Sequence, residues 1–485
     1  MSELYKHSAT ELSQMLRNKD VKPSEIAQSF VDRYKATNDK TNAYAYLDCD
    51  ATLAKAKELD ATPITEATSP LFGLPVSIKD NIATVDMPTT CSSKMLEGYT
   101  APYDATVITK IRNAGALPFG KLRMDEFAMG SGNNEDSVTV KNPHDLTRSP
   151  GGSSSGSGAA VASGSALIAF GTDTGGSIRL PANYCGLVGY KPTYGAVSRY
   201  GCVGYAGSLD QIGPIARTVA DAAMFAEVIS GHDPRDAKSK PNYTPNFSGI
   251  QTYNLKGKKI GYIKETFSEC LTPDMEKTLQ GVMDAYKSLG AIVEEVSIPL
   301  VAQIPPVYYV TGLTEAASSL ARFDGVGFGH RTAQYDTLDD LYTKSRTEGF
   351  GNKVKQRLWL GTYFVSAGQY EKYYHKARVA RAMLTRQFED AYKTYDFLLT
   401  PMFASTAPLL GEALTDEVDW HADVCATPVN LAGLPSVALP CGTINNMPAG
   451  FQLIGKWFKD SELLGAAQAY EKENCNFANK LAEVK

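Results

Sequence analysis

The stretch from Ser149 to Lys191 reads SPGGSSSGSGAAVASGSALIAFGTDTGGSIRLPANYCGLVGYK, and the prediction of the fold begins there. Two Gly/Ser-rich loops, Gly151 to Gly158 and Gly171 to Ser177, enclose a segment of small residues and an apolar run from Ala166 to Phe170. The pattern predicts a loop, a short helix over Ala159 to Ser165, a buried strand and a second loop. Glycines allow close approach of the backbone to a ligand, and successive N–H groups in such a turn can hold an oxyanion.

Three interpretations of these loops compete. A flexible Gly/Ser linker would not run straight into a buried apolar strand and a second glycine loop. A phosphate cradle would need GxxxxGK[ST] or GxGxxG spacing, and the stretch has neither. A serine nucleophile would use the G-x-S-x-G match around Ser154, but that motif requires an apolar strand before it, and Asn142 to Pro150 is polar. Ser154 is therefore a poor candidate for a nucleophile elbow.

Three motifs, in chain order, resemble the amidase signature family. They are SIKDN (Ser77 to Asn81), GGSS (Gly151 to Ser154) and DTGGSIR (Asp173 to Arg179), and the resemblance runs from about Leu71 to about Gly455. It implies a Ser-cisSer-Lys triad with Ser177 as acyl nucleophile, Ser153 as the bridging serine and Lys79 as base. It also implies an oxyanion hole made of backbone N–H groups, those of Thr174, Gly175, Gly176 and Ser177.

The base that activates the serine is the point on which the alternatives differ. No histidine lies in the Gly/Ser stretch, although folding could bring one there, so a Ser-His-Asp triad stays open. Lys79 ends the apolar strand predicted over Pro75 to Ile78. A free lysine titrates near ~10.4, so its pKa must fall by roughly 3.4 to be half neutral at pH 7, and burial can cause a fall of that order. The ordinary interpretation of Lys79 is a surface lysine paired with Asp80.

Composition limits the classes of function. The chain has 485 residues, 43% of them apolar, a formal net charge of −5 and no run of Lys and Arg, so it should bind nucleic acid or anionic membranes poorly. Its eight cysteines show no C-x-x-C spacing, which argues against zinc and for reduced thiols. The polar N-terminus and the absence of an 18-residue apolar run predict a cytoplasmic protein without a membrane span.

Alternation of strands and helices predicts an α/β fold, a large mixed β-sheet covered by helices on both faces. We expect one domain over residues 1–485, with a helical N-terminal segment over about 1–60 and the signature core over about 71–230. Ser8 with Glu11 predicts a capping box, and Asp50 and Asp104 are predicted helix caps. Thr311 to Tyr395 is predicted to be mostly helical.

Four further segments resemble one branch of the family, the A subunits of glutamyl-tRNA(Gln) amidotransferases. They are KPTYGAVSRYG, SLDQIGPIARTVADAA, ARFDGVGFG and ATPVNLAGLPSVALPCG. The branch implies a glutaminase that supplies ammonia to B and C subunits of a heterotrimer, in which a partner subunit uses ATP and Mg to amidate Glu-tRNA(Gln). It implies no cofactor and no metal in this chain. A stand-alone amidase acting on another amide, and a non-catalytic Gly/Ser-loop binding module, remain alternatives.

Free glutamine would require two charges in the site. Arginine suits the α-carboxylate because its planar fork binds both oxygens, and a carboxylate suits the α-ammonium group. The resemblance to the branch places these roles on Arg357 and Asp423, with a hydroxyl contact from Tyr308 or Tyr309. The ordinary interpretations are a solvated Arg357 on a helix and an Asp423 that caps a helix before Val424.

Overall fold

A mixed sheet of eleven strands organises the computed structural model, which describes residues 3–132, 138–412, 414–474 and 479–484. The strand order is β1-β3-β2-β4-β6-β5-β10-β11-β9-β7-β8. The strands are Tyr44–Tyr46 (β1), Pro75–Lys79 (β2), Leu117–Leu122 (β3), Ile168–Asp173 (β4), Val188–Lys191 (β5), Gln211–Ala216 (β6), Lys259–Ile263 (β7), Ile292–Val296 (β8), Phe397–Pro401 (β9), Ser436–Ile444 (β10) and Met447–Ile454 (β11).

The sheet is antiparallel in the middle and parallel on either side of this middle, and at one edge β1 pairs antiparallel with β3. Strands β4, β6, β5, β10, β11 and β9 pair antiparallel in that order, while β2 pairs parallel with β3 and β4, and β7 with β8 and β9. Val76 of β2 lies opposite Ile168 of β4, and Ser77 lies opposite Ala169. Parallel neighbours end at the same edge, so this register brings Lys79 beside the last residues of β4.

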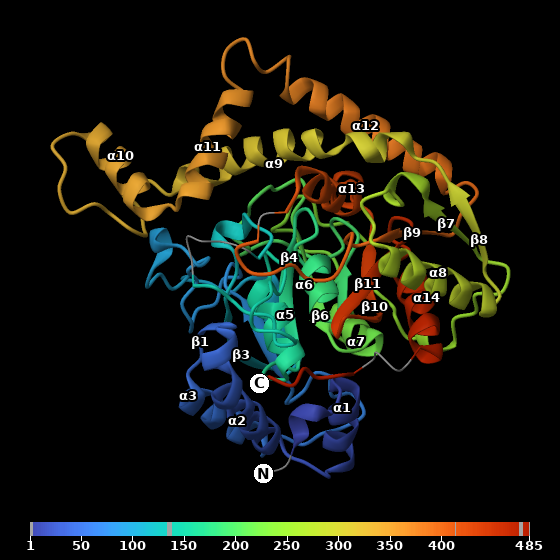
Figure 1. Cartoon of the computed structure of the whole chain (residues 1–485). Coiled ribbons are helices and arrows are strands. Elements are labelled where there is room, and N and C mark those ends of the chain that lie inside the picture. The colour runs from blue at the N-terminus through green and yellow to red at the C-terminus, as the bar shows by residue number, and fades with distance from the viewer. Residues whose placement is uncertain (1–2, 133–137, 413, 475–478, 485) are drawn as a thin grey trace.

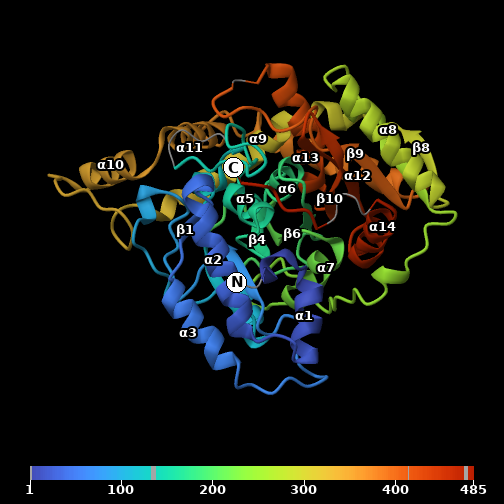
Figure 2. The same cartoon turned by 60° about the horizontal axis from the view of Figure 1, so that its bottom comes forward.

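Helices cover the sheet on both faces, as predicted (Figures 1 and 2). In one group α5 and α6 pack together and on β4 and β5; in another, α7, α8 and α14 pack on β6 and β10. The α-helices are Ala9–Asn18 (α1), Pro23–Thr41 (α2), Cys49–Leu59 (α3), Thr106–Asn113 (α4), Ser155–Ser163 (α5), Arg179–Tyr184 (α6), Val219–Ile229 (α7), Pro273–Ser288 (α8), Pro305–Ser319 (α9), Leu338–Gly349 (α10), Asn352–Phe364 (α11), Tyr374–Ala391 (α12), Asp416–Ala432 (α13) and Asp460–Glu473 (α14).

A separate helical layer lies over one edge of the sheet. Helices α11, α12 and α13 pack on α9, and this layer has its own apolar cluster, distinct from the core around the sheet (Figure 1). Helix α10 projects from the body in both views (Figures 1 and 2). The mostly helical character expected for Thr311 to Tyr395 is therefore confirmed.

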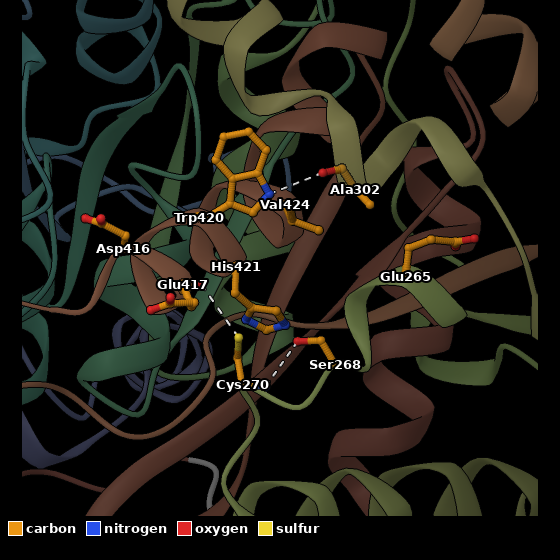
Figure 3. A pocket seen from close by; sticks show the side chains of 9 residues that line it. All are labelled: Glu265, Ser268, Cys270, Ala302, Asp416, Glu417, Trp420, His421 and Val424. Atoms are coloured by element: carbon orange, nitrogen blue, oxygen red, sulfur yellow. Dashed lines mark hydrogen bonds between the residues drawn. The ribbon is translucent and has the colours of Figure 1, made fainter.

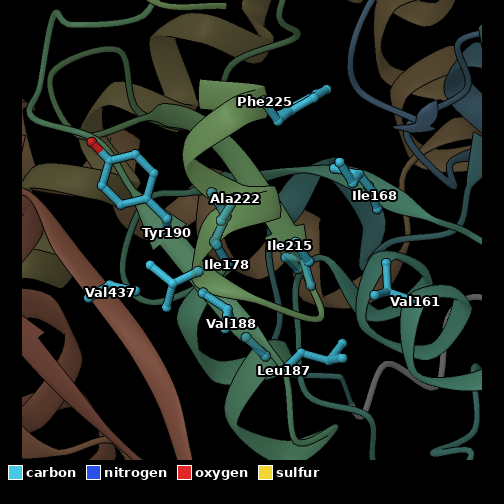
Figure 4. Packing of buried hydrophobic residues seen from close by; sticks show 14 of the residues in the cluster. Val161, Ile168, Ile178, Leu187, Val188, Tyr190, Ile215, Ala222, Phe225 and Val437 are labelled. Carbon is cyan, nitrogen blue, oxygen red and sulfur yellow. The ribbon is translucent and has the colours of Figure 1, made fainter. Parts of the chain in front are cut away.

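The core around the sheet is built from apolar residues of β4, β5 and β6 and of the flanking helices (Figure 4). Phe170 of β4 and Phe225 of α7 are fully buried, and their ring centroids lie 4.7 Å apart at an interplanar angle of 64°. Burying one such side chain stabilises the fold by roughly 1.5–3 kcal/mol. The Gly/Ser stretch is thus held against a tightly packed part of the molecule.

Some local predictions are wrong in detail. The first Gly/Ser loop is itself helical from Ser155, so α5 begins earlier than the small-residue segment suggested. Asp48, not Asp50, caps α3, with its carboxylate accepting the Ala51 N–H, and Asp104 is no cap of α4 because its carboxylate accepts the N–H of Val85. The capping box of Ser8 and Glu11 is confirmed. Among the described residues no helix has the length and apolar character that crossing a membrane requires.

Candidate active site

Lys79 stands at the end of β2 and is fully buried. Its Nζ lies 2.9 Å from Ser153 Oγ, 2.8 Å from Ser154 Oγ and 2.8 Å from Thr172 Oγ1. Burial lowers the pKa of this ammonium group to about 8, against the attraction of Asp125, which raises it. The interpretation of Lys79 as a surface lysine paired with Asp80 is wrong, because Asp80 faces the buried Lys121 at 3.5 Å.

Ser153 follows a cis peptide bond, Gly152–Ser153, and is fully buried. The Asp125 N–H donates to the Ser153 carbonyl at 3.1 Å, and the Gly132 N–H donates to the Asp125 carboxylate at 2.9 Å. A Cβ atom at Gly152 would lie 2.1 Å from Asp125 Oδ2, so only glycine fits there. Asp125 thus packs directly behind Ser153.

Ser177 sits between β4 and α6 at the rim of a cavity of about 250 Å³. Its carbonyl accepts hydrogen bonds from the backbone N–H of Ser154 at 3.3 Å and from the Ser154 hydroxyl at 2.5 Å. Within the described part of the chain its own hydroxyl makes no hydrogen bond, and the residue is 8% exposed. Ser154 therefore holds the two loops together, while the Ser177 hydroxyl stays open to the cavity.

A buried ion pair shapes the loop that carries Ser177. Arg179 Nε lies 3.0 Å from Asp173 Oδ2, and both side chains are fully buried. The Asp173 carboxylate also accepts the N–H of Gly176 at 2.8 Å and of Ile178 at 3.1 Å. In this structure the Gly176 N–H, one of the four predicted oxyanion donors, is therefore engaged by Asp173.

Three of the predicted oxyanion donors remain. The N–H groups of Thr174, Gly175 and Ser177 have no acceptor among the described residues. The Thr174 hydroxyl donates to the buried Asp210 at 2.6 Å, which fixes the start of the loop. Gly176 has φ +116°, a backbone conformation that glycine adopts readily. These three N–H groups are the ones able to meet a negative oxygen near Ser177.

The predicted glutamine-binding residues line the same cavity as Ser177. Tyr308 and Tyr309 come from α9, Arg357 from α11 and Asp423 from α13. The Tyr309 hydroxyl donates to Asp423 Oδ2 at 2.7 Å, and burial raises the pKa of Asp423 to about 6. The Tyr308 side chain lies against Gly175, where a Cβ would be 2.5 Å from its hydroxyl. Asp423 is inside α13 and not at its start, so its interpretation as a cap is wrong.

The cavity has lining residues that the sequence reasoning missed. Asp419 lies one turn before Asp423 on α13, Tyr205 precedes the loop that holds Asp210, and Ser131 follows Gly130 in the loop behind the bridging serine. Only Asp419 had a usable signal, since four-residue spacing on a helix places it on the same face as Asp423. The position of Asp125 behind Ser153 could not be predicted either, because Asp125 lies outside the three motifs.

Histidine takes no part in this constellation. None of the six histidines forms a hydrogen bond with Ser153, Ser154 or Ser177, and all six are described residues. His421 lines a second cavity of about 460 Å³ on another face of α13, where its Nε2 donates to the Thr266 carbonyl at 2.8 Å (Figure 3). The Ser-His-Asp alternative therefore finds no support. No three His, Cys, Asp or Glu side chains of the described residues group as metal ligands.

Comparison with known proteins agrees with this geometry. A family profile described as Amidase matches residues 25–464. The A subunit of a glutamyl-tRNA(Gln) amidotransferase from Carboxydothermus hydrogenoformans is 46% identical over 473 residues, 97% of this chain and 98% of the relative. The corresponding protein from Sulfurihydrogenibium sp. is 44% identical over 99% of this chain and 100% of the relative.

Solved structures show the same likeness. The crystal structure of the A subunit of a glutamyl-tRNA(Gln) amidotransferase from Thermotoga maritima superposes with a TM-score of 0.83 at 35% identity, covering 100% of this chain and 99% of that one. A peptide amidase from Stenotrophomonas maltophilia superposes with a TM-score of 0.82 at 27% identity, covering 99% and 98%. The matched profile and these relatives, together with the Lys79–Ser153 contact and the place of Ser177 in the cavity lining, show that the chain belongs to the amidase signature family.

Proposed function

We propose that this chain is a glutaminase, the amidase component of a glutamyl-tRNA(Gln) amidotransferase. The observation that carries the proposal is the contact of 2.9 Å between the buried Lys79 Nζ and Ser153 Oγ, next to the open hydroxyl of Ser177. The near-complete coverage of A-subunit relatives at 42–46% identity supports the choice of substrate. The second support is the opposite pair of charges, Arg357 and Asp423, in the cavity.

The first step moves a proton away from Ser177. Lys79 reacts in its neutral form, whose lone pair accepts the hydroxyl proton of Ser153. Ser153 in turn takes the hydroxyl proton of Ser177, whose oxygen bonds to the amide carbon of glutamine. The carbonyl oxygen becomes negative, and the N–H groups of Thr174, Gly175 and Ser177 stabilise it.

The second step releases ammonia. The C–N bond of the tetrahedral intermediate breaks while the proton held on Lys79 returns through Ser153 to the leaving nitrogen. An ester between Ser177 and the γ-carbonyl of glutamate remains. Water then attacks this ester by the same proton route and releases glutamate.

The assembly follows from the same proposal. B and C subunits would complete the enzyme, and a partner subunit would use ATP and Mg to join the ammonia to Glu-tRNA(Gln). The chain's net charge of −5 supports leaving tRNA phosphates to that partner. It would act in the cytoplasm, where aminoacyl-tRNA is made.

The test is covalent labelling with a serine-reactive amidase probe, read by mass spectrometry, together with glutamine hydrolysis. We expect the probe on Ser177 and complete loss of labelling and activity in Ser177→Ala, with Lys79→Ala inactive as well. The control is His421→Ala, which should keep activity because its ring faces the second cavity. Labelling of Ser154 with Ser177 spared would show the assignment to be wrong. Hydrolysis of other amides with no hydrolysis of glutamine would favour a stand-alone amidase.

A further inference from the structure

The outer faces of α11 and α12 form an apolar surface that no described residue covers. Eight of the twenty largely exposed large apolar side chains in the described residues lie between Trp359 and Met383. Trp359 is 71% exposed and Met383 50% exposed. Such a concentration is more than scattered surface residues would give, and contiguous exposed apolar area marks an interaction site. The set is Trp359, Leu360, Tyr363, Val365, Tyr370, Tyr373, Val379 and Met383, here named the α11–α12 surface.

Helical spacing groups these residues on the exposed side of each helix, and a ring contact links the two groups at the connection between the helices. Trp359 and Tyr363 are four apart on α11, and Val379 and Met383 are four apart on α12. The ring of Tyr363 lies beside the ring of Tyr373, the residue before α12, at a centroid distance of 5.9 Å. Both helices pack on α9 by their other, buried faces, and they form the outside of the helical layer in Figures 1 and 2.

The charge around this surface is opposite to that of the chain. Residues 351–390 carry eight Lys and Arg against three Asp and Glu. Two of the eight lie away from this surface, Arg357 in the cavity and Arg381 bonded to Ser208 and the Leu431 carbonyl, so the other six leave a net +3 in a chain of net −5. Lys376 and Arg386 are exposed on the same face of α12 as Val379 and Met383, at helical spacing. An acidic surface with an apolar centre is complementary to this arrangement.

The identity of the apolar residues distinguishes a protein from a nucleic acid. Aromatic and basic side chains alone would also suit stacked bases and phosphates. Leu360, Val365, Val379 and Met383, however, are exposed aliphatic or thioether side chains, which offer nothing to a base or a phosphate. Trp, Tyr, Met and Arg are enriched at protein interfaces. The observations therefore favour a protein.

The position of α11 relates this surface to the chemistry. Arg357 lines the glutamine cavity from α11, and Trp359 and Leu360 follow it at once on the outer side of the same helix. Ammonia that escapes into water at neutral pH becomes ammonium, which is no nucleophile. The protein that receives ammonia gains if it covers the surface next to the cavity.

We infer that the α11–α12 surface is where this chain docks an acidic, apolar face of the partner subunit that receives ammonia; this inference rests on the proposed function. The area around Trp359 would be the centre of the interface, because buried Trp and Tyr carry most of the binding energy in such contacts. The basic residues of α12 would form its rim and speed association.

The test measures affinity of the purified full-length chain for the co-expressed B and C subunits, with two variants and one matched control. Val379→Asp and Val85→Asp make the same change at two valines that are each 48% exposed, only the first on the surface. We expect Val379→Asp and Trp359→Asp each to raise the dissociation constant about 30-fold or more, and Val85→Asp to leave it unchanged. All three should keep the wild-type circular dichroism and the wild-type rate of probe labelling at Ser177.

Other outcomes would contradict the inference in distinguishable ways. Equal affinity of all variants for the B and C subunits would place the interface elsewhere and leave the proposed function intact. Loss of a homodimer in sedimentation, with subunit binding unchanged, would make a second copy the occupant. If the variants lose binding of tRNA in a filter-binding assay while their affinity for the B and C subunits is unchanged, the α11–α12 surface binds RNA. A wild-type chain that neither hydrolyses glutamine nor binds the subunits would refute both proposals.

Discussion

At Lys79, burial and neighbouring carboxylates act on one proton in opposite directions. Burial prevails and lowers the pKa to about 8, so about 1% of the group is neutral at pH 6 and about half at pH 8. In the proposed mechanism the neutral amine is the base, so the titration of Lys79 alone should raise kcat/KM for glutamine about 50-fold from pH 6 to pH 8. A pH–rate profile of the free enzyme measures this.

The control for that profile is Asp125→Asn. The Asp125 carboxylate raises the pKa of Lys79, so its removal should move the rising limb to lower pH. Two results would contradict the role of Lys79. One is a rising part of the profile at the same pH in Asp125→Asn as in wild type, and the other is a shift of that rising part when a histidine is substituted.

The Asp173–Arg179 pair supports a prediction about stability. Burial alone would raise the pKa of Asp173, but Arg179 outweighs it and holds that pKa well below its usual range. A carboxylate with a depressed folded pKa stabilises the fold above its unfolded pKa of ~3.9 and loses this contribution as the pH falls below that value. Asp173→Asn should therefore lower the free energy of unfolding by about 3–5 kcal/mol at pH 7, because it leaves Arg179 buried without its counter-ion.

Denaturant titration at pH 7 and pH 3 measures this, and the gap between variant and wild type should shrink at pH 3. Asp390→Asn, which breaks the exposed pair with Lys393, is the control and should leave the midpoint unchanged. A pH-independent gap would show that the loss comes from packing and not from the ion pair.

The motifs predicted which side chains meet, but not how each donor is used. Lys79, Ser153 and Ser177 come from three separated segments, and the parallel register of β2 with β4 brings them to one edge. The hydrogen bond from the Gly176 N–H to Asp173 could not be predicted from the sequence. It depends on the backbone conformation of Gly176, with φ +116°, and a Gly-Gly sequence can adopt many other conformations.

At the scale of elements, the proposed recognition of glutamine rests on α11 and α13, which both contribute side chains to the lining of the cavity. Arg357 and Asp423 each contribute one charge from one helix. Removing one partner of a buried charge contact costs ~2–5 kcal/mol, so Arg357→Ala or Asp423→Ala should lower kcat/KM for glutamine roughly 30-fold or more. Butyramide, which lacks the α-charges, should be hydrolysed nearly as fast by the variants as by wild type.

Steady-state kinetics on both substrates check this, with Lys355→Ala as control on the same helix outside the cavity lining. Burial raises the pKa of Asp423 to about 6, which predicts a pH dependence of substrate binding. Below pH 6 the carboxyl group becomes neutral, so the KM for glutamine should rise. Unchanged glutamine kinetics in both alanine variants would favour the stand-alone amidase.

Element boundaries show where local sequence is insufficient. The cap of α1 was predictable because Ser8 and Glu11 bond to each other's backbone within one turn. Asp104 was misassigned because its carboxylate accepts the N–H of Val85, nineteen residues earlier. Asp423 was placed correctly in the cavity only by resemblance, since a tertiary contact with Tyr309 and not a cap explains its position.

At the scale of the molecule, the class of sheet was predictable and its order was not. Alternating strands and helices indicate an α/β fold, yet nothing local tells that β6 lies between β4 and β5, or that β9 lies between β11 and β7. Only global packing selects those neighbours. The outer aromatic residues of α11 and α12 were likewise predicted as helix, and their exposure became visible only with the fold.

The same whole-molecule arrangement makes a prediction about where the ammonia goes. If the partner covers the surface beside the cavity, ammonia from glutamine reaches the tRNA-bound glutamate before it mixes with the solvent. With amide-15N glutamine and excess unlabelled ammonium, the intact complex should form Gln-tRNA(Gln) that carries mainly 15N. The Val379→Asp complex, loosened at that surface, should form product with less 15N and should release more glutamate per product, while Val85→Asp matches wild type. Mass spectrometry of the released glutamine gives the isotope ratio. A product whose label equals the bulk ratio in the wild-type complex would mean that ammonia crosses open solvent, and that docking beside the cavity serves some other purpose.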